Sequence, residues 1–364
     1  MNDAAQHRSV RIPRLLRLVE GVSDAADSLS ELATEANGPL LAVHSGDRSG
    51  SGYGQLFVAA ARDRGHRLLE CVVDAKTTAS VSEVGRNIAA DRPAFVIGIG
   101  GGRVVDVAKL AAAQNGTDFI SVPTQASSDG LCSPVAVVVS EDGRPSSIGA
   151  RVPVGIIVDM DVLRSAPLLT WRSGLGDLVS NLSAVRDWRD AHAQRAESID
   201  DFACLTSEAA ALSVAGDTAD LADRNYQQKL VRGLILSGIA MEMAGSSRPA
   251  SGSEHLISHA LDLILEKPHL HGLQVALATI ATTILRGDDV RWLTDFYRRV
   301  GLPIMPLDLG ISITTFMEAV RLGPTTRLGR STLLDDIDEA DLARLEAVYT
   351  ADTTVERPIA AMKP

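Results

Sequence analysis

His255, His259 and His271 lie within seventeen residues of one another, in a chain that has eight histidines. His255 and His259 are four residues apart in S-G-S-E-H-L-I-S-H-A-L-D (251–262), so a helix would place them on the same face. Neutral imidazole is a common metal ligand, and two histidines with one carboxylate form an open three-ligand site. The spacing therefore predicts a catalytic metal site.

The carboxylate that completes this site has three candidates, Asp177, Glu254 and Asp262. Glu254 would point about 100° away from His255 on a helix, which makes it a poor co-ligand. Asp262 could instead orient the ring of His259. Spacing alone does not choose among the three. The pair is not the H-E-x-x-H of a metalloprotease, and a non-haem iron(II) site is the alternative.

A glycine-rich loop joins a buried apolar run to a helical run in G-I-G-G-G-R-V-V-D-V-A-K (98–109). Gly100, Gly101 and Gly102 lack Cβ atoms, so backbone N–H groups can approach an anion at the helix N-terminus. The loop is neither G-x-G-x-x-G nor a P-loop. Because Asp106 and Lys109 follow on the next turns, we expect the loop to bind a nucleotide, and an iron(II) oxygenase would leave it without a role.

A second polar turn follows the next strand, in S-V-P-T-Q-A-S-S-D-G-L-C-S-P (121–134). Ligands of open α/β sheets bind at the carboxyl ends of strands. Thr124, Ser127 and Ser133 can donate to phosphates, ribose or a nicotinamide amide, and Asp129 adds a carboxylate. An ordinary turn would also be rich in such residues.

The first half of the chain alternates strand-like and helical runs. Strands are expected at 39–45, 66–73, 94–100 and 118–123, and helices at 52–64, 77–90 and 104–114. This alternation predicts an open, mostly parallel sheet with helices on both faces. Further strands near 134–140 and 153–158 flank the turn E-D-G-R-P (141–145), which is typical of a hairpin.

Helical periodicity dominates from about residue 164 onward. We expect helices at 174–193, 201–217, 225–245, 253–266, 272–285, 289–299, 311–321 and 337–350. A domain boundary near 160–168 would divide the chain into an α/β domain, 1–163, and a helical domain, 164–364, that binds metal and substrate.

Composition excludes several classes of protein. The 364 residues carry a net charge of −11, which argues against nucleic acid or an anionic membrane as a partner. No run of about 18 apolar residues could span a bilayer, and no signal peptide is evident. Three scattered cysteines favour a reducing, cytoplasmic location.

Together these motifs resemble the iron-containing alcohol dehydrogenase and dehydroquinate synthase superfamily, and most closely the sn-glycerol-1-phosphate dehydrogenases. The matching stretches are R-S-V-R-I-P-R near the start, the two loops above, G-D-L-V-S-N, the histidine segment, H-G-L-Q-V, and G-L-P followed by R-S-T-L-L. The resemblance implies a Rossmann-like nucleotide-binding domain followed by an all-helical domain, with the active site between them. It also implies a homo-oligomer and a role in phospholipid metabolism.

The resemblance assigns roles to individual residues. It makes Asp177, His255 and His271 the ligands of one divalent metal, with zinc favoured over nickel or iron. His259 and Asp129 would be catalytic, and both would contact the substrate together with Asp177. Positions that would bind NAD or NADP are Gly100, Gly101, Gly102, Arg103, Asp106, Thr124, Ser127 and Ser133.

The implied reaction reduces dihydroxyacetone phosphate, a phosphorylated three-carbon ketone, to sn-glycerol 1-phosphate. Ser128 replaces the family's histidine before Asp129, and Gln125 and Cys132 also depart from its pattern. These departures motivate the first alternative, a dehydrogenase of the same fold for another polyol, aldehyde or phosphorylated ketone. A dehydroquinate-synthase-type cyclisation and a non-catalytic nucleotide-binding protein are the other two alternatives.

Several charged residues are candidates for binding the anionic groups of the substrate and the cofactor. Arg248 or Lys267 could meet the substrate phosphate. Asp47 and Arg48, after the first strand, leave the choice between NAD and NADP open.

Overall fold

A six-stranded parallel sheet forms the first part of the chain in the computed structural model, which describes residues 9–33, 38–46, 52–141, 143–195 and 197–351. The strand order is β1-β8-β5-β4-β2-β3. The strands are β1 (Leu15–Val19), β2 (Leu40–His44), β3 (Leu68–Val72), β4 (Phe95–Gly100), β5 (Asp118–Pro123) and β8 (Gly155–Asp159). The parallel sheet confirms the expected fold class.

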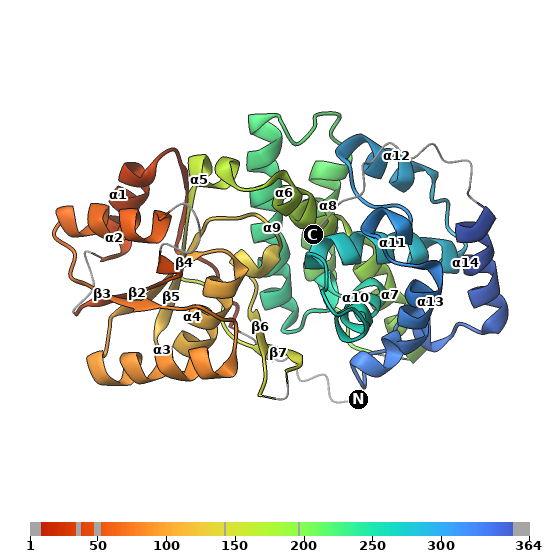
Figure 1. The fold of residues 1–364 in the computed structure, drawn as a ribbon, viewed down its shortest axis with the longest axis horizontal. Coiled ribbons are helices and arrows are strands. Elements are labelled where there is room, and N and C mark those ends of the chain that lie inside the picture. Colours follow the sequence, from red (N-terminus) through yellow and green to blue (C-terminus); the bar gives the residue numbers. More distant parts are fainter. Residues whose placement is uncertain (1–8, 34–37, 47–51, 142, 196, 352–364) are drawn as a thin grey trace.

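Helices cover both faces of this sheet. Figure 1 shows α1 (Val22–Ala33) and α2 (Tyr53–Asp63) on one side, and α3 (Thr78–Asp91) and α4 (Gly102–Gln114) on the other. Every residue of β2 and β4 is buried, as strands covered on both faces require. Strand β1 and helix α1 were not predicted from the sequence.

The hairpin prediction was right about the turn and wrong about one strand. Strand β6 (Val135–Val139) pairs antiparallel with β7 (Pro145–Gly149), which was not predicted. The run expected at 153–158 is β8, which lies in the main sheet between β1 and β5. Its apolar side chains are fully buried, whereas β7 alternates between exposed and half-buried residues and lacks an apolar signal.

From Met160 onward the described elements are helical. They are α5 (Met160–Ser165), α6 (Leu168–Val179), α7 (Asn181–Arg195), α8 (Asp201–Ala215), α9 (Arg224–Ala244), α10 (Ser253–Ile264), α11 (His271–Arg286), α12 (Arg291–Val300), α13 (Ile313–Leu322) and α14 (Glu339–Ala351). The single helix expected at 174–193 is two helices that meet at Ser180. None of the helices in the described ranges has the length and apolarity that crossing a bilayer would need.

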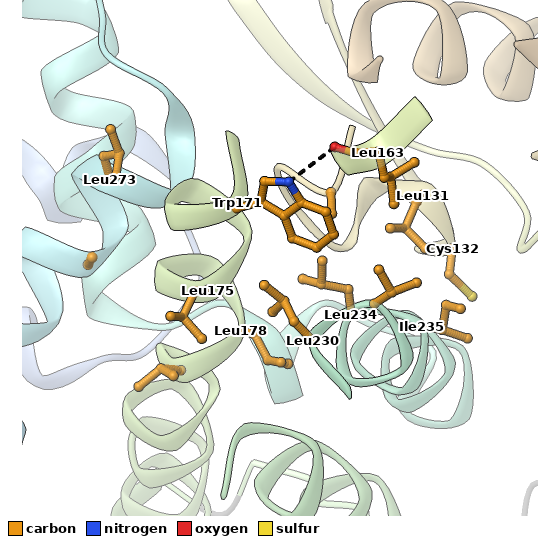
Figure 2. Close-up of a cluster of buried hydrophobic side chains, with 14 of the residues drawn as sticks. Leu131, Cys132, Leu163, Trp171, Leu175, Leu178, Leu230, Leu234, Ile235 and Leu273 are labelled. Atoms are coloured by element: carbon orange, nitrogen blue, oxygen red, sulfur yellow. Dashed lines mark hydrogen bonds between the residues drawn. The ribbon is translucent and has the colours of Figure 1, made fainter. Parts of the chain in front are cut away.

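One hydrophobic core continues from the sheet into the helices. Trp171 on α6 lies at this junction, and its indole N–H donates to the carbonyl of Leu163 at 3.1 Å (Figure 2). Figure 2 also shows Leu131, from the turn after β5, near Leu234 of α9, in the same hydrophobic cluster. Shared packing of this kind fixes the elements that carry the polar loops relative to those that carry the histidines. The boundary near 160–168 remains an interpretation of the sequence.

Candidate metal and nucleotide site

Asp177, His255 and His271 come together although they lie on three different helices. Nε2 of His255 lies 3.7 Å from Oδ1 of Asp177, and Nε2 of His271 lies 3.6 Å from the same oxygen. All three potential ligand atoms are within 4.8 Å of one another. Ligands about 2.1 Å from a shared tetrahedral ion would be roughly 3.4 Å apart, so this donor set fits a metal ion. Asp177 is therefore the carboxylate that the geometry favours.

Glycines allow helices α6 and α11 to approach closely enough to form this group. A Cβ on Gly176 would lie 2.3 Å from the carbonyl oxygen of Gly272, and a Cβ on Gly272 would lie 1.8 Å from that of Ser173. Asp177 directly follows the first glycine, and His271 directly precedes the second. The close crossing therefore brings the carboxylate to the first residue of α11.

Each histidine is held by its second ring nitrogen. Nδ1 of His255 lies 3.0 Å from Oε1 of Glu254, and Nδ1 of His271 lies 3.3 Å from the hydroxyl of Ser258. Such contacts fix the ring so that Nε2 faces the metal position. Glu254 does not belong to the group of candidate ligands, and its contact with Nδ1 of His255 was not predicted from the sequence.

The orienting role suggested for Asp262 is not what the structure has. Oδ1 of Asp262 accepts a hydrogen bond from Nε2 of Gln274 at 2.9 Å. Gln274 also donates to Ser258, so these two residues brace the contact to His271 rather than His259. Asp262 does lie on α10 three residues after His259, but the residue that it binds is Gln274 of α11.

The pKa values of Asp177, His255 and His271 are all shifted by burial and by the charges of their neighbours. Although burial opposes it, the carboxylates of Asp177 and Glu254 raise the pKa of His255 to about 9. Burial, followed by the nearby charge of His255, lowers the pKa of His271 to about 4. The pKa of Asp177 falls despite its burial, because His255 and His271 favour the carboxylate. The carboxylate is thus ready to bind a cation.

Asp129 supports the group from the turn after β5. Its backbone N–H donates to Oδ2 of Asp177 at 2.9 Å, and its carboxylate accepts from the hydroxyl of Ser237 on α9 at 2.9 Å. Burial and the charge of Asp177 raise the pKa of Asp129 to about 7. The structure thus brings Asp129 next to the proposed metal ligands.

His259 lies one helical turn after His255. Its ring centre is 6.5 Å from that of His255 and 6.3 Å from that of His271. Burial first, and then the charges of His271 and His255, lower its pKa to about 3. The imidazole is therefore neutral, with one nitrogen free to donate and one to accept.

The glycine loop opens into a cavity of about 780 Å³ that extends to His271. A Cβ on Gly100 would meet Val104 at 2.9 Å and one on Gly101 would meet Gln125 at 3.0 Å, whereas a Cβ on Gly102 would meet nothing within 4 Å. Gly102 is also the first residue of α4, so the open space lies at a helix N-terminus, where an anion is favoured.

Most of the residues predicted to bind the cofactor line this cavity. They are Gly100, Gly101, Gly102, Arg103, Asp106, Thr124 and Ser127. Ser133 does not belong to this set, because its side chain is buried and its hydroxyl donates to the carbonyl of Val135 at 3.2 Å. The composition of the turn 121–134 could not show which hydroxyl groups face the cavity and which, like that of Ser133, are buried in the protein.

Two charged residues of α4, Asp106 and Lys109, bind other groups of the protein. Lys109 is 1% exposed and donates to the carbonyls of Gly130 and Ser133 at 2.9 and 3.0 Å, so it braces the second loop instead of facing a nucleotide. Asp106 faces the cavity, where its carboxylate forms an ion pair with Lys76 at 2.6 Å. The sequence analysis missed Lys76, although a lysine just after a predicted strand was the signal available. It offsets an acidic charge that would otherwise repel a pyrophosphate.

Neither Arg248 nor Lys267, the residues suggested to contact the substrate phosphate, is among the residues that line the cavity. Arg248 is 3% exposed; its guanidinium forms an ion pair with Glu197 and donates to the carbonyl of Ser331. Lys267 is exposed on the turn after α10. Asp47 and Arg48 lie outside the described residues.

The chain is similar in sequence to dehydrogenases of one family. A family model described as iron-containing alcohol dehydrogenase matches residues 22–167. Glycerol-1-phosphate dehydrogenase (NAD(P)+) of Pyrococcus furiosus is 40% identical over 265 residues, covering 72% of this chain and 76% of that protein. The protein of the same name from Methanothermobacter thermautotrophicus is 36% identical over 333 residues, covering 90% and 94%.

Solved structures share the fold at low sequence identity. A probable glycerol dehydrogenase from Sinorhizobium meliloti superposes with a TM-score of 0.72 at 21% identity, covering 94% of this chain and 99% of that one. An iron-containing alcohol dehydrogenase from Thermotoga maritima gives a TM-score of 0.67 at 13% identity, with the same coverage. The sequence relatives extend over nearly the whole fold, and the chain therefore belongs to the glycerol-1-phosphate dehydrogenase family of the iron-containing alcohol dehydrogenases.

Proposed function

We propose that this protein is a metal-dependent NAD(P)H oxidoreductase that interconverts dihydroxyacetone phosphate and sn-glycerol 1-phosphate. One observation supports this proposal above all: the cavity of the glycine loop, where a cofactor would bind, extends to His271, a member of the candidate metal group Asp177, His255 and His271. A hydride donor and a carbonyl group could therefore lie side by side. The names of the sequence relatives supply the substrate.

Two bound groups would complete the site: a divalent ion to act as a Lewis acid towards the carbonyl oxygen, and a nicotinamide to supply the hydride. Asp177, His255 and His271 would hold the ion. Gly100, Gly101, Gly102, Arg103, Asp106, Thr124 and Ser127 would hold the cofactor. Zinc suits one carboxylate and two imidazoles, and nickel and iron are the alternatives.

The residues of the chain would position the substrate and handle the proton. Asp177 fixes the turn at Asp129, whose carboxylate is already held by Ser237. Asp129 would accept a hydrogen bond from a substrate hydroxyl. A neutral ring nitrogen of His259 would exchange the proton of the alcohol oxygen with solvent.

Ser128 does not by itself exclude this substrate. Its hydroxyl lines the cavity and accepts a hydrogen bond from the N–H of Gly130 at 3.3 Å, so it shapes the turn that carries Asp129. A dehydrogenase of the same fold for another polyol, aldehyde or phosphorylated ketone is the second candidate, because Ser128 stands where the family has histidine. A cytoplasmic location stays a prediction from the cysteines, and a homo-oligomer stays a prediction from the resemblance.

The test is oxidation of NADH and NADPH at 340 nm with dihydroxyacetone phosphate, after chelation and after adding back zinc, nickel or iron. We expect metal-dependent oxidation that is lost in His271→Ala. The product should resist a dehydrogenase specific for sn-glycerol 3-phosphate, because the proposed product is its mirror image. Metal-loaded, folded protein that oxidises neither cofactor would reject this substrate, and a panel of polyols and aldehydes would then test the second candidate.

A further inference from the structure

Two arginines from the segment after α13 converge on one serine beside the histidine helix. Nη1 of Arg327 and Nη2 of Arg330 each donate to the hydroxyl of Ser247 at 2.9 Å. Arg330 also donates to the carbonyl of Ser251. Both side chains are half-buried. Ser247 and Ser251 belong to the turn that leads into α10, the helix of His255 and His259.

These arginines lack acidic partners. Among the residues that the structure describes, no carboxylate lies within ion-pair distance of Arg327 or Arg330, and their hydrogen-bond acceptors are neutral. The neighbouring Arg248 already has its own carboxylate, that of Glu197. The carboxylates of Glu254 and Glu197 act on Arg330 only from beyond ion-pair distance. Two guanidinium groups that are held close together and partly out of water, with no carboxylate in direct contact, repel each other and favour a bound anion.

The electrostatics agree with this description. Burial, followed by the charges of Arg327 and Arg248, lowers the pKa of Arg330 to about 9. An anion placed between these guanidinium groups would offset the repulsion. Phosphate fits especially well, because the planar guanidinium can bind two of its oxygens at once.

The arginines also lie near the proposed reaction centre. Thr326, next to Arg327, donates from its hydroxyl to the carbonyl of Leu256 on α10 at 3.4 Å, so the segment packs directly on the histidine helix. The ring of His259 feels both arginine charges: they follow burial and the other two histidines among the causes of its lowered pKa. An anion bound here would lie near α10, the helix of His259, and neither arginine is among the residues that line the cavity of the glycine loop.

We propose that Arg327 and Arg330 form the subsite that binds the phosphate group of the substrate. The inference rests on the proposed function for the identity of that anion, but not for the existence of an anion site. It replaces Arg248 and Lys267 as phosphate contacts. It also gives a physical reason for a phosphorylated substrate to be preferred over a free polyol, since only the phosphate would bring an anion into direct contact with the two guanidinium groups.

The test separates binding from turnover. Calorimetric titration of the metal-loaded enzyme with inorganic phosphate measures the anion site, and kcat/KM for dihydroxyacetone phosphate and for unphosphorylated dihydroxyacetone measures its use. In Arg330→Gln and Arg327→Gln we expect phosphate affinity to fall roughly 10- to 100-fold, the effect of losing a charge-assisted hydrogen bond. The preference for the phosphorylated ketone should fall by a similar factor.

Two further variants serve as controls for the change in phosphate affinity. Arg330→Lys keeps the charge without the planar fork and should recover part of the phosphate affinity. Arg321→Gln removes an arginine that is paired with Glu339 on the surface, and should leave phosphate affinity unchanged. Thermal unfolding of each variant checks that the turn at Ser247 remains folded.

Three results would overturn the phosphate subsite, and a fourth would reject only the proposed function. Turnover of dihydroxyacetone phosphate with an unchanged preference in both glutamine variants would overturn the subsite. So would the absence of phosphate binding by the unmodified enzyme, or a loss that falls on NADPH instead of the ketone. Arginine-dependent phosphate binding by an enzyme that does not reduce dihydroxyacetone phosphate would instead leave the anion site standing and reject the proposed function.

Discussion

Replacing Glu254 with glutamine should weaken metal binding although Glu254 is not a ligand. The carboxylate is fully buried; its Oε1 lies 3.0 Å from Nδ1 of His255 and accepts from the N–H of Gly252 at 2.6 Å. Glutamine has the same shape and can still accept both hydrogen bonds through its amide oxygen. The substitution therefore removes the negative charge that makes the imidazole a better donor, and leaves the orientation of the ring nearly intact.

The expected size of the effect follows from the geometry. Contacts of this kind typically contribute 10- to 100-fold in metal affinity, or about 1.4 to 2.7 kcal/mol. We expect Glu254→Gln to lie in the lower part of that range, because only the charge is lost. Glu254→Ala should exceed it, and should also lower the free energy of unfolding by about 1–3 kcal/mol, since a buried N–H and a ring nitrogen lose their acceptor.

Competition with a chromophoric chelator measures zinc affinity, and chemical denaturation of the metal-free protein measures stability. Glu242→Gln is the matched control, because Glu242 is also a largely buried glutamate that accepts a backbone N–H, that of Arg11 at 3.3 Å. Zinc affinity of Glu254→Gln within threefold of the unmodified protein would refute the reasoning. Equal losses in Glu254→Gln and Glu242→Gln would refute it as well, because the effect would then not be local.

Three further substitutions test how the backbone and the buried charges build the site. Gly102→Ala should leave thermal stability unchanged but raise the Kd for NAD(P)H by tenfold or more (about 1.4 kcal/mol), because its methyl group would enter only the cavity; fluorescence titration checks this. Gly272→Ala should abolish metal binding in a chelator assay, because a Cβ 1.8 Å from the backbone oxygen of Ser173 would force α6 and α11 apart. Asp187→Ala should lower the free energy of unfolding by about 3–5 kcal/mol in urea denaturation, because it leaves the buried charge of Arg286 unpaired.

The fold was largely predictable because its elements have strong local patterns. The run 94–100 has no polar side chain, and it forms β4, which is buried throughout. The missed strand β7 shows the limit of this reasoning. Its sequence P-S-S-I-G has little apolar content, and only its pairing with β6 makes it a strand.

The site was predictable in its residue types but not in its contacts. Histidine spacing indicated a metal, whereas the choice of Asp177 over Glu254 and Asp262 depends on where α6 crosses α11. The position of that crossing could not be predicted, because α6 and α11 are far apart in the sequence. Lys109 illustrates the opposite error: its position after the glycine loop favoured a nucleotide contact, yet its ammonium group is buried against two carbonyls.

The turn after β5 connects the two halves of the site physically. Its residues Ser127 and Ser128 face the cofactor cavity, while Asp129, the next residue, holds the carboxylate of Asp177 through its N–H. Lys109 fixes the same turn from the helix that begins at the glycine loop. One short segment therefore lines the cavity proposed for the cofactor and also contacts Asp177, a proposed metal ligand. If both proposals hold, a displacement of this turn would change the cofactor position and the metal position together, so the turn would align the hydride donor with the metal.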